Sequence, residues 1–329
     1  MECAILIAGP TAGGKSRLAI ELAMELARDQ GCDRGSDRGK ARGGVIINAD
    51  SMQVYRELRI LSARPSADEE AAIPHRLYGI TSAAAAFSVG RWVTLALAEI
   101  AAARQRGQVP IVVGGTGLYF QALTEGMAEI PDISDTARGE ARRRLDELGA
   151  VGLHDVLRQR DPEMAARLQP TDSQRLVRAY EVILATGVSL AHWQRQPATT
   201  AVLAGPWRGF VLNRPRQDLY RRCDARLAAM LDQGALDEVA ALAALELDPS
   251  LPAMKALGVP ELIRLSRGEL TRAVALAAAQ QATRRYAKRQ MTWFRNKMCS
   301  WQGLNTQDSE RLSNIITPFI TKNQLTPPS

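Results

Sequence analysis

Cysteine is scarce in this chain, and the few cysteines present are widely separated. They are Cys3, Cys32, Cys223 and Cys299, and no two of them form a CxxC pair. The spacing therefore indicates neither a disulfide framework nor a cysteine-based zinc site. A reducing compartment fits this pattern.

Long apolar runs are also missing. No stretch approaches the ~18 consecutive apolar residues that a membrane-spanning helix requires. The first residues do not have the pattern of a secretory signal peptide, because Glu2 stands where a basic group is expected and the apolar run 3–8 is short. We therefore expect a cytoplasmic protein with no membrane partner.

Aromatic residues make up only 5% of the 329 residues, whereas hydrophobic residues reach 46% and charged residues 23%. This is the composition of a globular protein, and it excludes a wholly disordered or fibrous chain. The length fits about two domains, or one core with an insertion. The net charge of +7 suits a phosphate-rich partner, although a basic soluble surface explains it equally well.

Apolar runs alternate with helical patterns in the first third of the chain. Runs rich in Ile, Leu and Val at 4–8, 45–47 and 110–113 predict buried strands. Helices are predicted between them at 16–28 and 88–106. This order predicts an α/β fold with a parallel sheet, whose chemistry lies at the C-terminal ends of the strands.

The strand pattern stops between 131 and 206, where we predict helices at 135–148, 152–160, 162–168 and 173–186. We interpret 131–206 as an all-helical insertion between two parts of the core, 1–130 and 207–304. A strand near 209–212 returns the chain to the sheet, and helices follow at 217–233, 236–245, 259–265 and 270–296. The Gly-, Asp- and Arg-rich segment 29–44 predicts a mobile surface loop, and we expect the polar tail 305–329 to be frayed.

The most specific local motif follows the first predicted strand and opens the first predicted helix. It matches GxxxxGK[ST], the phosphate-binding loop or P-loop. Its glycines let backbone N–H groups approach phosphate oxygens, Lys15 adds a charge, and the Ser16 hydroxyl is a candidate Mg²⁺ ligand. The motif does not specify the phosphate ester, so ATP is the default expectation. The loop consists of Gly9, Pro10, Thr11, Ala12, Gly13, Gly14, Lys15 and Ser16.

Polar segments follow the second and third predicted strands. Asp50, in the segment NADSMQVY, can serve as a general base or as a group near a metal, but it could equally cap a helix. Thr116, in the segment VGGTGLY, offers a hydroxyl to a phosphate or a base, and the glycines beside it allow close approach of a ligand. Taken alone, a tight strand-to-helix turn explains that glycine-rich segment better.

Basic residues cluster twice within the predicted insertion. Arg175 and Arg178 lie three residues apart in the segment QRLVR, so they share a helix face. Arg138 and Arg142–Arg144 form the other cluster. A solvated helix face is the usual explanation of such runs, but two clusters in one insertion favour a surface that binds nucleic acid.

The last predicted helix contains the most basic segment of the chain, at 283–297. It combines six basic residues with Tyr286, Trp293 and Phe294 and has no acidic residue. Basic groups neutralise phosphates, and aromatic rings stack on unpaired bases. An amphipathic helix with its rings in the core is the alternative. We expect the rings to be largely packed and the cations to face a nucleic acid.

Taken together and in this order, the motifs resemble those of the tRNA isopentenyltransferase family, the tRNA dimethylallyltransferases. The matching segments are GPTAGGKS, DSMQVY, RLYG (76–79), VGGTGLY, QRLVRAYE, KALG (255–258) and YAKRQMTWFR, and they span residues 9–295. The chain departs from the family pattern at Val259 and Pro260, where Tyr-Lys is usual, and at Gly13, where Ser is common.

The resemblance implies an α/β fold: a P-loop NTPase-like parallel sheet core flanked by helices, with an all-helical insertion that binds the tRNA anticodon stem-loop. It implies transfer of the dimethylallyl group from dimethylallyl diphosphate to N6 of the adenosine 3′-adjacent to the anticodon, with release of diphosphate. The P-loop then holds a diphosphate leaving group rather than cleaving ATP. Mg²⁺ is the implied cofactor, and we expect the enzyme to be a monomer.

The resemblance also implies roles for individual residues. Asp50, Lys15 and Thr116 are the expected catalytic residues, with Asp50 accepting a proton from the attacking amine, and Ser16 is the expected metal ligand. Residues 9–16 are expected to bind the diphosphate together with Arg222 and Arg226, which lie four apart on a predicted helix. The residues expected to contact tRNA are Asp50, Ser51, Met52, Gln53, Thr116, Arg138, Gln174, Arg175, Leu176, Val177, Arg178, Lys255, Ala256, Leu257 and Gly258.

Two other functions are compatible with parts of the sequence. The P-loop alone fits a small-molecule or nucleotide kinase, which would consume ATP but has no need of a basic, aromatic C-terminal helix. A non-catalytic RNA-binding module would use the basic clusters but would have no use for Asp50 as a base.

Overall fold

The computed structural model describes residues 3–28, 43–198 and 200–305. The chain forms two compact units: the core, which consists of residues up to Thr124 and from Leu203 onward, and the insertion, Glu125–Val202. Both boundaries of the insertion lie a few residues before the expected positions, 131 and 206. The predicted loop at 29–44 and the predicted frayed tail lie almost entirely outside the described residues.

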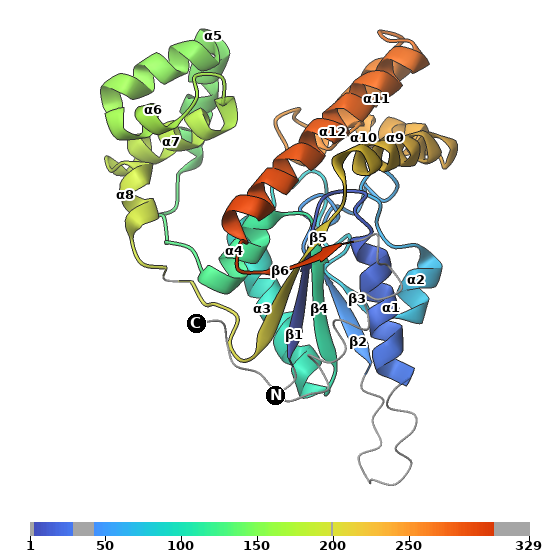
Figure 1. The fold of residues 1–329 in the computed structure, drawn as a ribbon. Helices are drawn as coiled ribbons and strands as arrows, with labels where there is room; N and C mark the ends of the chain where they lie inside the picture. Colours follow the sequence, from blue (N-terminus) through green and yellow to red (C-terminus); the bar gives the residue numbers. More distant parts are fainter. Residues whose placement is uncertain (1–2, 29–42, 199, 306–329) are drawn as a thin grey trace. The chain divides into compact units, whose positions relative to one another are not determined.

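A six-stranded sheet forms the centre of the core, in the order β3-β2-β4-β1-β5-β6 (Figure 1). All neighbouring strands in it are parallel, and Ile5 of β1 lies between Ile111 of β4 and Arg208 of β5. The expected α/β fold, one parallel sheet flanked by helices, is therefore confirmed. The strands are β1 (Ala4–Ala8), β2 (Gly44–Asn48), β3 (His75–Arg76), β4 (Val109–Gly114), β5 (Trp207–Asn213) and β6 (Gln302–Asn305).

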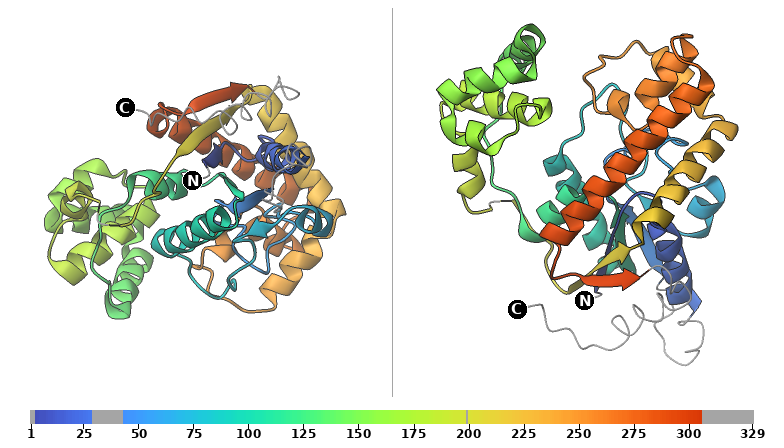
Figure 2. Two further views of the ribbon diagram at one scale, coloured as in Figure 1. Left: turned by 90° about the horizontal axis from the view of Figure 1, so that it is seen from below. Right: turned by 45° about the horizontal axis from the view of Figure 1, so that its top comes forward.

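Helices cover both faces of this sheet, as Figure 2 shows for α1 (Lys15–Arg28) and α3 (Val89–Gln105) on opposite sides of the strands. α1 packs its leucines against Ile5 and Ile7 of β1. Ile5, Leu6 and Ile7 are all fully buried. A parallel sheet covered on both faces has continuous apolar strands, and this is why the short Ile- and Leu-rich runs were readable as strands.

The remaining helices of the core surround the carboxyl ends of the strands. α9 to α12 pack on the loop 52–63 and form a second apolar cluster there with Val54, Tyr55, Leu58 and Leu61. This cluster fixes the loop that follows β2. The elements are α2 (Ala67–Ala72), α4 (Gly117–Glu125), α9 (Arg216–Asp232), α10 (Ala235–Ala243), the 3-10 turn η1 (Ala253–Lys255), α11 (Val259–Ser266) and α12 (Arg272–Lys297).

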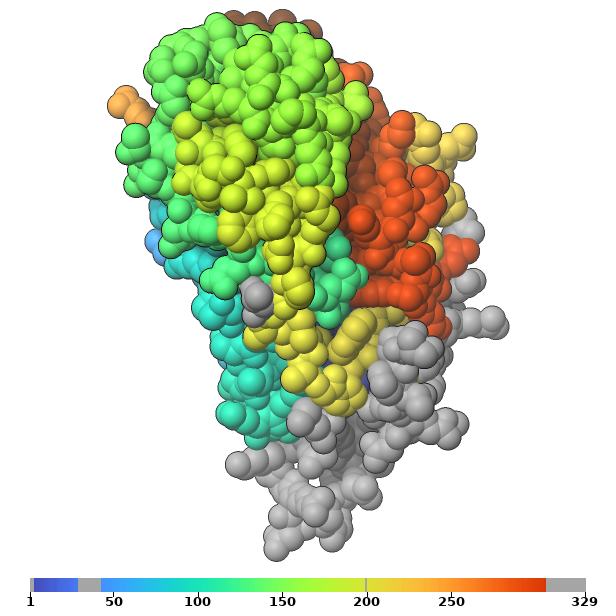
Figure 3. All heavy atoms as spheres, turned by 90° about the vertical axis from the view of Figure 1, so that its left-hand side faces the viewer, coloured from blue at the N-terminus to red at the C-terminus, as the bar shows by residue number. Residues whose placement is uncertain are grey.

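In its described residues, the regular structure of the insertion is entirely helical: α5 (Asp135–Arg160), α6 (Pro162–Arg167), α7 (Ser173–Thr186) and α8 (Leu190–Arg195). These helices have their own apolar core, which includes Leu153, Leu157 and Tyr180. In the space-filling view, the atoms of these helices, green to yellow, pack against one another without a gap (Figure 3). Gly149 interrupts α5 with φ 66° and ψ 178°, and this break separates the two helices expected at 135–148 and 152–160.

None of the described helices combines the length and the apolar character needed to cross a bilayer.

Candidate active site

The P-loop connects the end of β1 to the first turn of α1 and borders a cleft of about 540 Å³. Ala12 and Gly14 have positive φ values of 58° and 95°, which turn the loop back on itself. Gly13 N donates to Pro10 O at 3.0 Å, and a Cβ on Gly13 would approach that oxygen to 2.8 Å. The tight loop leaves the N-terminus of α1, with its partial positive charge, open to the cleft.

Lys15 is held over this loop by one strong hydrogen bond. Its Nζ donates to Pro10 O at 2.7 Å. Burial lowers the pKa of Lys15 from 10.5 to about 8; the negative charge of Asp50 opposes this shift, and the positive charge of Arg226 adds to it. The ammonium is thus placed in the cleft, and it interacts electrostatically with the carboxylate of Asp50, which follows β2.

Two arginines of α9 contact the loop from the side. Arg222 Nε donates to Ala12 O at 3.2 Å, and the Arg226 guanidinium donates to Thr11 Oγ1. Burial lowers the pKa of Arg226. Both arginines line the cleft together with the P-loop residues Ala12 to Ser16, whereas Gly9 and Pro10 are buried beneath it. One cleft therefore gathers the charged groups that the sequence predicted as diphosphate ligands.

Asp50 follows β2 and is fixed by its neighbours. Asn48 is fully buried; its Oδ1 accepts from Asp50 N at 2.8 Å and its Nδ2 donates to Asp50 O at 3.0 Å. Asp50 Oδ1 accepts the N–H of Met52 at 2.9 Å. In the described chain the next helix, α2, begins only at Ala67, so the alternative role of Asp50 as a helix cap is wrong. Asp50 does not line the P-loop cleft, but Lys15 and Arg226, which do, both interact with it electrostatically.

Thr116 holds the segment of Asp50 from the neighbouring strand. Its Oγ1 accepts from Ser51 N at 2.9 Å, and its own N–H donates to Ala49 O at 3.1 Å. A Cβ on Gly114 would lie 2.0 Å from Ala49 O, so only glycine fits there. The backbone of Ala49 takes the room that this glycine leaves. The segment is therefore a tight strand-to-helix turn between β4 and α4.

Gln290 of α12 joins the two halves of the site, and the sequence analysis did not single it out. It is 5% exposed. Its Oε1 accepts from Thr11 N at 2.8 Å, and its Nε2 donates to Gly115 O at 2.8 Å. Tyr286 lies one turn earlier on the same helix; burial has the larger effect on its pKa and raises it, whereas interactions with the side chains of Thr116 and Gln290 lower it. One buried amide therefore ties the P-loop to the loop after β4.

The pattern of α12 contained a signal for this residue. Thr283, Ala287, Gln290 and Phe294 are buried and recur at helical spacing. An uncharged amide in that stripe, among many cations, indicates a buried polar contact. Phe294 is buried, and Tyr286 and Trp293 are half-buried, which agrees with the expectation that the rings are largely packed. The exposed cations of this stretch are Arg285, Lys288, Arg289, Arg295 and Lys297.

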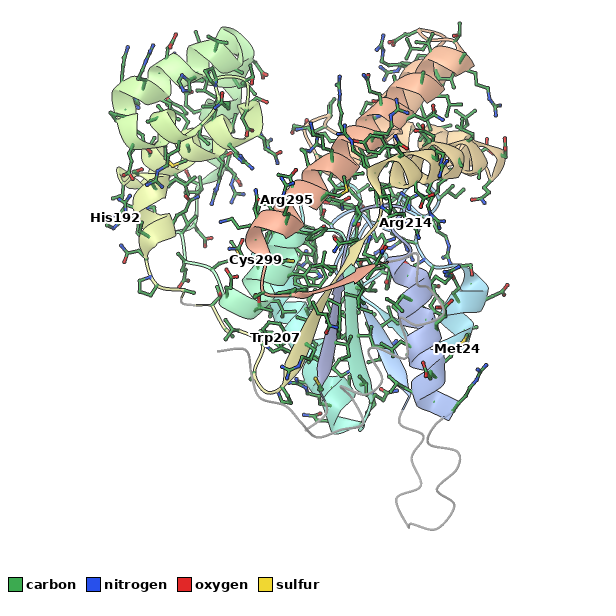
Figure 4. All side chains as sticks on the ribbon, in the orientation of Figure 1. Met24, His192, Trp207, Arg214, Arg295 and Cys299 are labelled. Atoms are coloured by element: carbon green, nitrogen blue, oxygen red, sulfur yellow. The ribbon has the colours of Figure 1, made fainter. Side chains whose placement is uncertain are left out.

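A second cleft, of about 670 Å³, lies on the core between the start of α9 and the end of α12. Figure 4 labels Arg214 and Arg295, which line it together with Arg216 and Lys288. The described residues that line it include no carboxylate. This cleft therefore adds a strongly basic surface to the core.

The basic residues predicted to contact nucleic acid in the insertion belong to a different unit from the P-loop. Arg138, Arg175 and Arg178 each pair with a carboxylate three residues away on the same helix or at its cap, at 3.3–3.6 Å. Gln174 and Arg175 are exposed, whereas Leu176 is fully buried in the core of the insertion. The side chain of Leu176 therefore packs inside the unit, and its neighbours form the surface.

The segment 255–258 lies at the turn before α11 in the core. Lys255 is exposed, Ala256 and Gly258 are buried, and Leu257 is half-buried. Gly258 has φ 88°, and a Cβ there would lie 3.3 Å from Leu61. Of the residues in this segment, Lys255 is the one whose side chain is fully available to a partner.

Comparisons with known proteins match most of this chain. The family model described as IPP transferase matches residues 53–297. A tRNA dimethylallyltransferase of Rhodospirillum centenum is 52% identical over 97% of this chain and 96% of its own length. One of Rhodospirillum rubrum is 48% identical, over 98% and 91% respectively.

Solved structures show the same relationship. The full-length tRNA isopentenylpyrophosphate transferase of Bacillus halodurans is 30% identical, with a TM-score of 0.65 over 97% of each chain. A eukaryotic dimethylallyltransferase, solved acting on tRNA, is 24% identical and shares the fold, with a TM-score of 0.76 over 99% of this chain and 81% of its own. The matched family model and these relatives establish that the chain belongs to the IPP transferase family.

Proposed function

We propose that this protein transfers the dimethylallyl group of dimethylallyl diphosphate to N6 of the adenosine 3′-adjacent to the anticodon of tRNA and releases diphosphate. The observation that carries the proposal is that Lys15 belongs to the anion cleft and also interacts with the fixed carboxylate of Asp50. A kinase would use such a cleft and a nearby carboxylate as well, but it has no need of the exposed cations of α12, which suit the phosphates of a nucleic acid. The relatives named tRNA dimethylallyltransferase support the transfer reaction.

The cleft is suited to stabilise a departing diphosphate. As the bond between the allylic C1 and the diphosphate oxygen breaks, the electron pair leaves with the diphosphate and negative charge develops there. Lys15, Arg222 and Arg226 line the cleft, and their hydrogen bonds to the P-loop hold their positive charges there in advance. Donors arranged in advance stabilise such a transition state without reorganising.

Asp50 is suited to receive the proton of the attacking amine. The N6 amine of adenine is a poor nucleophile, because its lone pair is delocalised into the ring. As the N6–C1 bond forms, one N6 proton passes to the carboxylate of Asp50, so nitrogen ends neutral. Asn48 holds the backbone of Asp50, the N–H of Met52 donates to its carboxylate, and Thr116 accepts from the N–H of the next residue, Ser51.

The tRNA must present the adenine outside its stack for N6 to reach Asp50. Exposed cations on α12 and on the insertion supply charges for the phosphates of the anticodon stem-loop. We propose contacts at the residues that the sequence analysis assigned to tRNA, with Leu176 contributing through packing. We propose that the enzyme acts as a monomer, in the cytoplasm where its tRNA substrate is found.

Mg²⁺ fits the donor set beside the P-loop. Mg²⁺ commonly takes one or two protein oxygens and completes its shell with phosphate oxygens and water. The exposed Ser16 lines the cleft in the first turn of α1 and offers such an oxygen. The described residues contain no cluster of three His, Cys, Asp or Glu that could hold a metal by itself. We propose that Ser16 binds the ion together with the diphosphate, whose charge the ion would neutralise.

A label-transfer assay tests this proposal. The protein is incubated with radiolabelled dimethylallyl diphosphate, Mg²⁺ and tRNA that lacks the modification. Wild type should label the adenosine 3′ of the anticodon. Asp50→Asn should transfer roughly 10²–10⁴-fold more slowly while it binds tRNA with nearly unchanged affinity.

The exposed Asp232 supplies a matched control, because among the described residues its carboxylate pairs with a surface arginine, Arg272, at 3.3 Å. Asp232→Asn should transfer at the wild-type rate. A wild-type protein that labels no tRNA but converts ATP into a phosphorylated product would replace this proposal with the kinase.

A further inference from the structure

Arg64 is a buried cation whose hydrogen bonding is incomplete. Its side chain is 10% exposed, and within the described residues its Nε has no partner. Nη1 reaches Arg56 O only at 3.5 Å, and Nη2 stands 3.8 Å from a Glu70 oxygen, beyond hydrogen-bond distance. A guanidinium carries five N–H donors, and a buried charge normally has them paired.

Gly79, the last residue of the segment RLYG, makes room for this side chain. Gly79 has φ 59°, and a Cβ there would lie 2.3 Å from Arg64 Nη1 and 2.6 Å from its Cζ. The guanidinium therefore lies directly against the backbone of Gly79. Burial lowers the pKa of Arg64, the nearby charge of Arg59 adds to this, and Glu70 opposes it. The fold holds a charge in a place that disfavours it.

Arg64 also lines the P-loop cleft. The walls of the cleft come from the P-loop with the first turn of α1, from α9, and from the segment 63–65 with Glu69. Glu69 is the one carboxylate among these described lining residues, and its Oε2 already accepts from Ser66 N at 2.8 Å in a capping box. In the wall formed by the segment 63–65 and Glu69, the carboxylate of Glu69 is thus already hydrogen-bonded, whereas Arg64 has an N–H group, that of Nε, without a partner among the described residues.

We propose that Arg64 is a third arginine of the diphosphate site, donating to a phosphate oxygen from a different wall than Arg222 and Arg226. The assignment rests on the proposed function for the identity of the anion. A planar guanidinium with unpaired N–H groups suits phosphate, which it can contact with two parallel hydrogen bonds. Arginines from two separate segments let the cleft bind an anion with two phosphate groups from more than one side.

Titration calorimetry with inorganic diphosphate and Mg²⁺ tests this role directly. Arg64→Met keeps much of the volume but removes the charge, and it should weaken diphosphate binding by roughly 10–100-fold. Arg64→Lys should recover part of the loss, because it restores the charge without the two-pronged contact. The control is Arg264→Met, since Arg264 also pairs with a carboxylate, that of Glu269, but does not line the cleft. It should bind diphosphate within about twofold of wild type.

Steady-state kinetics then separate binding from folding. For Arg64→Met, KM for dimethylallyl diphosphate should rise while KM for tRNA stays nearly constant. A variant with a lower Tm but unchanged diphosphate affinity would show that Arg64 only supports the fold, and the proposal would be wrong. If Arg64→Met does not fold, Arg64→Gln compared with Arg64→Lys decides the same question.

Two further results are distinguishable. ATP titrated in parallel identifies the source of the phosphate: a loss confined to ATP would overturn the assignment to diphosphate. Binding of diphosphate needs no transfer reaction. A wild type that binds diphosphate but labels no tRNA would therefore contradict the proposed function, while the comparison of Arg64 variants would still decide the role of this arginine.

Discussion

At the scale of single residues, burial brings the pKa of Lys15 toward neutral pH. Its pKa is about 8, because burial removes water from the ammonium. Diphosphate requires the charged form, so its affinity should fall as the pH rises through 8, and binding above pH 8 should take up a proton. Lys15→Met should bind weakly and lack this component. Calorimetry in two buffers of different ionisation enthalpy measures the uptake; equal values for wild type and Lys15→Met at pH 8.5 would contradict it.

The same pKa makes a prediction for stability. The folded-state pKa of Lys15 lies below the ordinary value of 10.5, so between pH 8 and 10.5 the unfolded chain binds more protons. Lys15 therefore destabilises the fold below pH 8, and this effect fades as the pH rises through that window. We expect Lys15→Met to raise Tm at pH 7 and to raise it less at pH 9.5. Thermal unfolding at both pH values measures this, and a lower Tm at pH 7 would contradict it.

Gln290 should affect stability and catalysis together. Gln290→Met leaves the half-buried Thr11 N and the buried Gly115 O without their partner, and a buried group left unpaired costs about 1–3 kcal/mol. The transfer rate should also fall, because both loops of the site lose their link. Urea unfolding and the label-transfer assay measure the two effects. Gln281→Met, at an exposed position of the same helix, should change neither; equal behaviour of the two variants would exclude a role for Gln290.

These residues also mark how far the sequence could predict the site. The P-loop was readable, because its eight residues are contiguous and follow a strand. Gln290 was not singled out, because its partner Thr11 lies 279 residues away. The unpaired donors of Arg64 likewise depend on Gly79 and on the fold around it. A contact between distant segments leaves little trace in local spacing.

Among the elements, the strands found from the sequence are β1, β2 and β4, which are buried throughout, and β5, which is buried at residues 210–212. All four begin and end within two residues of the expected runs. β3 has only two residues, and β6 contributes the single buried residue Leu304, so neither has a periodic apolar pattern. α4 was missed, because it begins inside the glycine-rich segment after β4, and α2 and α8 are single short helices without a clear apolar stripe.

Gly149 divides α5 at a backbone conformation that only glycine adopts easily. Gly149→Ala should lower the free energy of unfolding by roughly 1–3 kcal/mol, although no atom lies near enough to clash with the new Cβ. Gly139→Ala, in a regular turn of the same helix and also with open space around it, should instead stabilise by about 0.5–1 kcal/mol. Chemical unfolding of both variants measures the difference, and effects of the same sign would contradict this account.

For the whole molecule, the sequence predicted the insertion because the strand pattern stops, and it placed the boundaries late because the linking segments carry no periodicity. The insertion has its own apolar core, around Leu153, Leu157, Leu176 and Tyr180. We therefore expect the fragment 125–202 to fold alone. Circular dichroism should show helix that melts in one cooperative transition, which Leu157→Ala weakens by about 2–5 kcal/mol. If the helical signal of the fragment instead declined gradually on heating, with no cooperative transition, the insertion would depend on the α/β core for its folding.

The chain leaves the core and returns to it at almost the same place, since Leu203 N donates to Leu123 O at 2.8 Å. The residues between these two leucines therefore form a branch of the chain whose two ends are joined by this backbone hydrogen bond. A branch of another length or shape could be grafted onto the same stem without shifting any strand register. Evolution, or an engineer, could therefore exchange what the branch recognises and keep the chemistry beneath it intact.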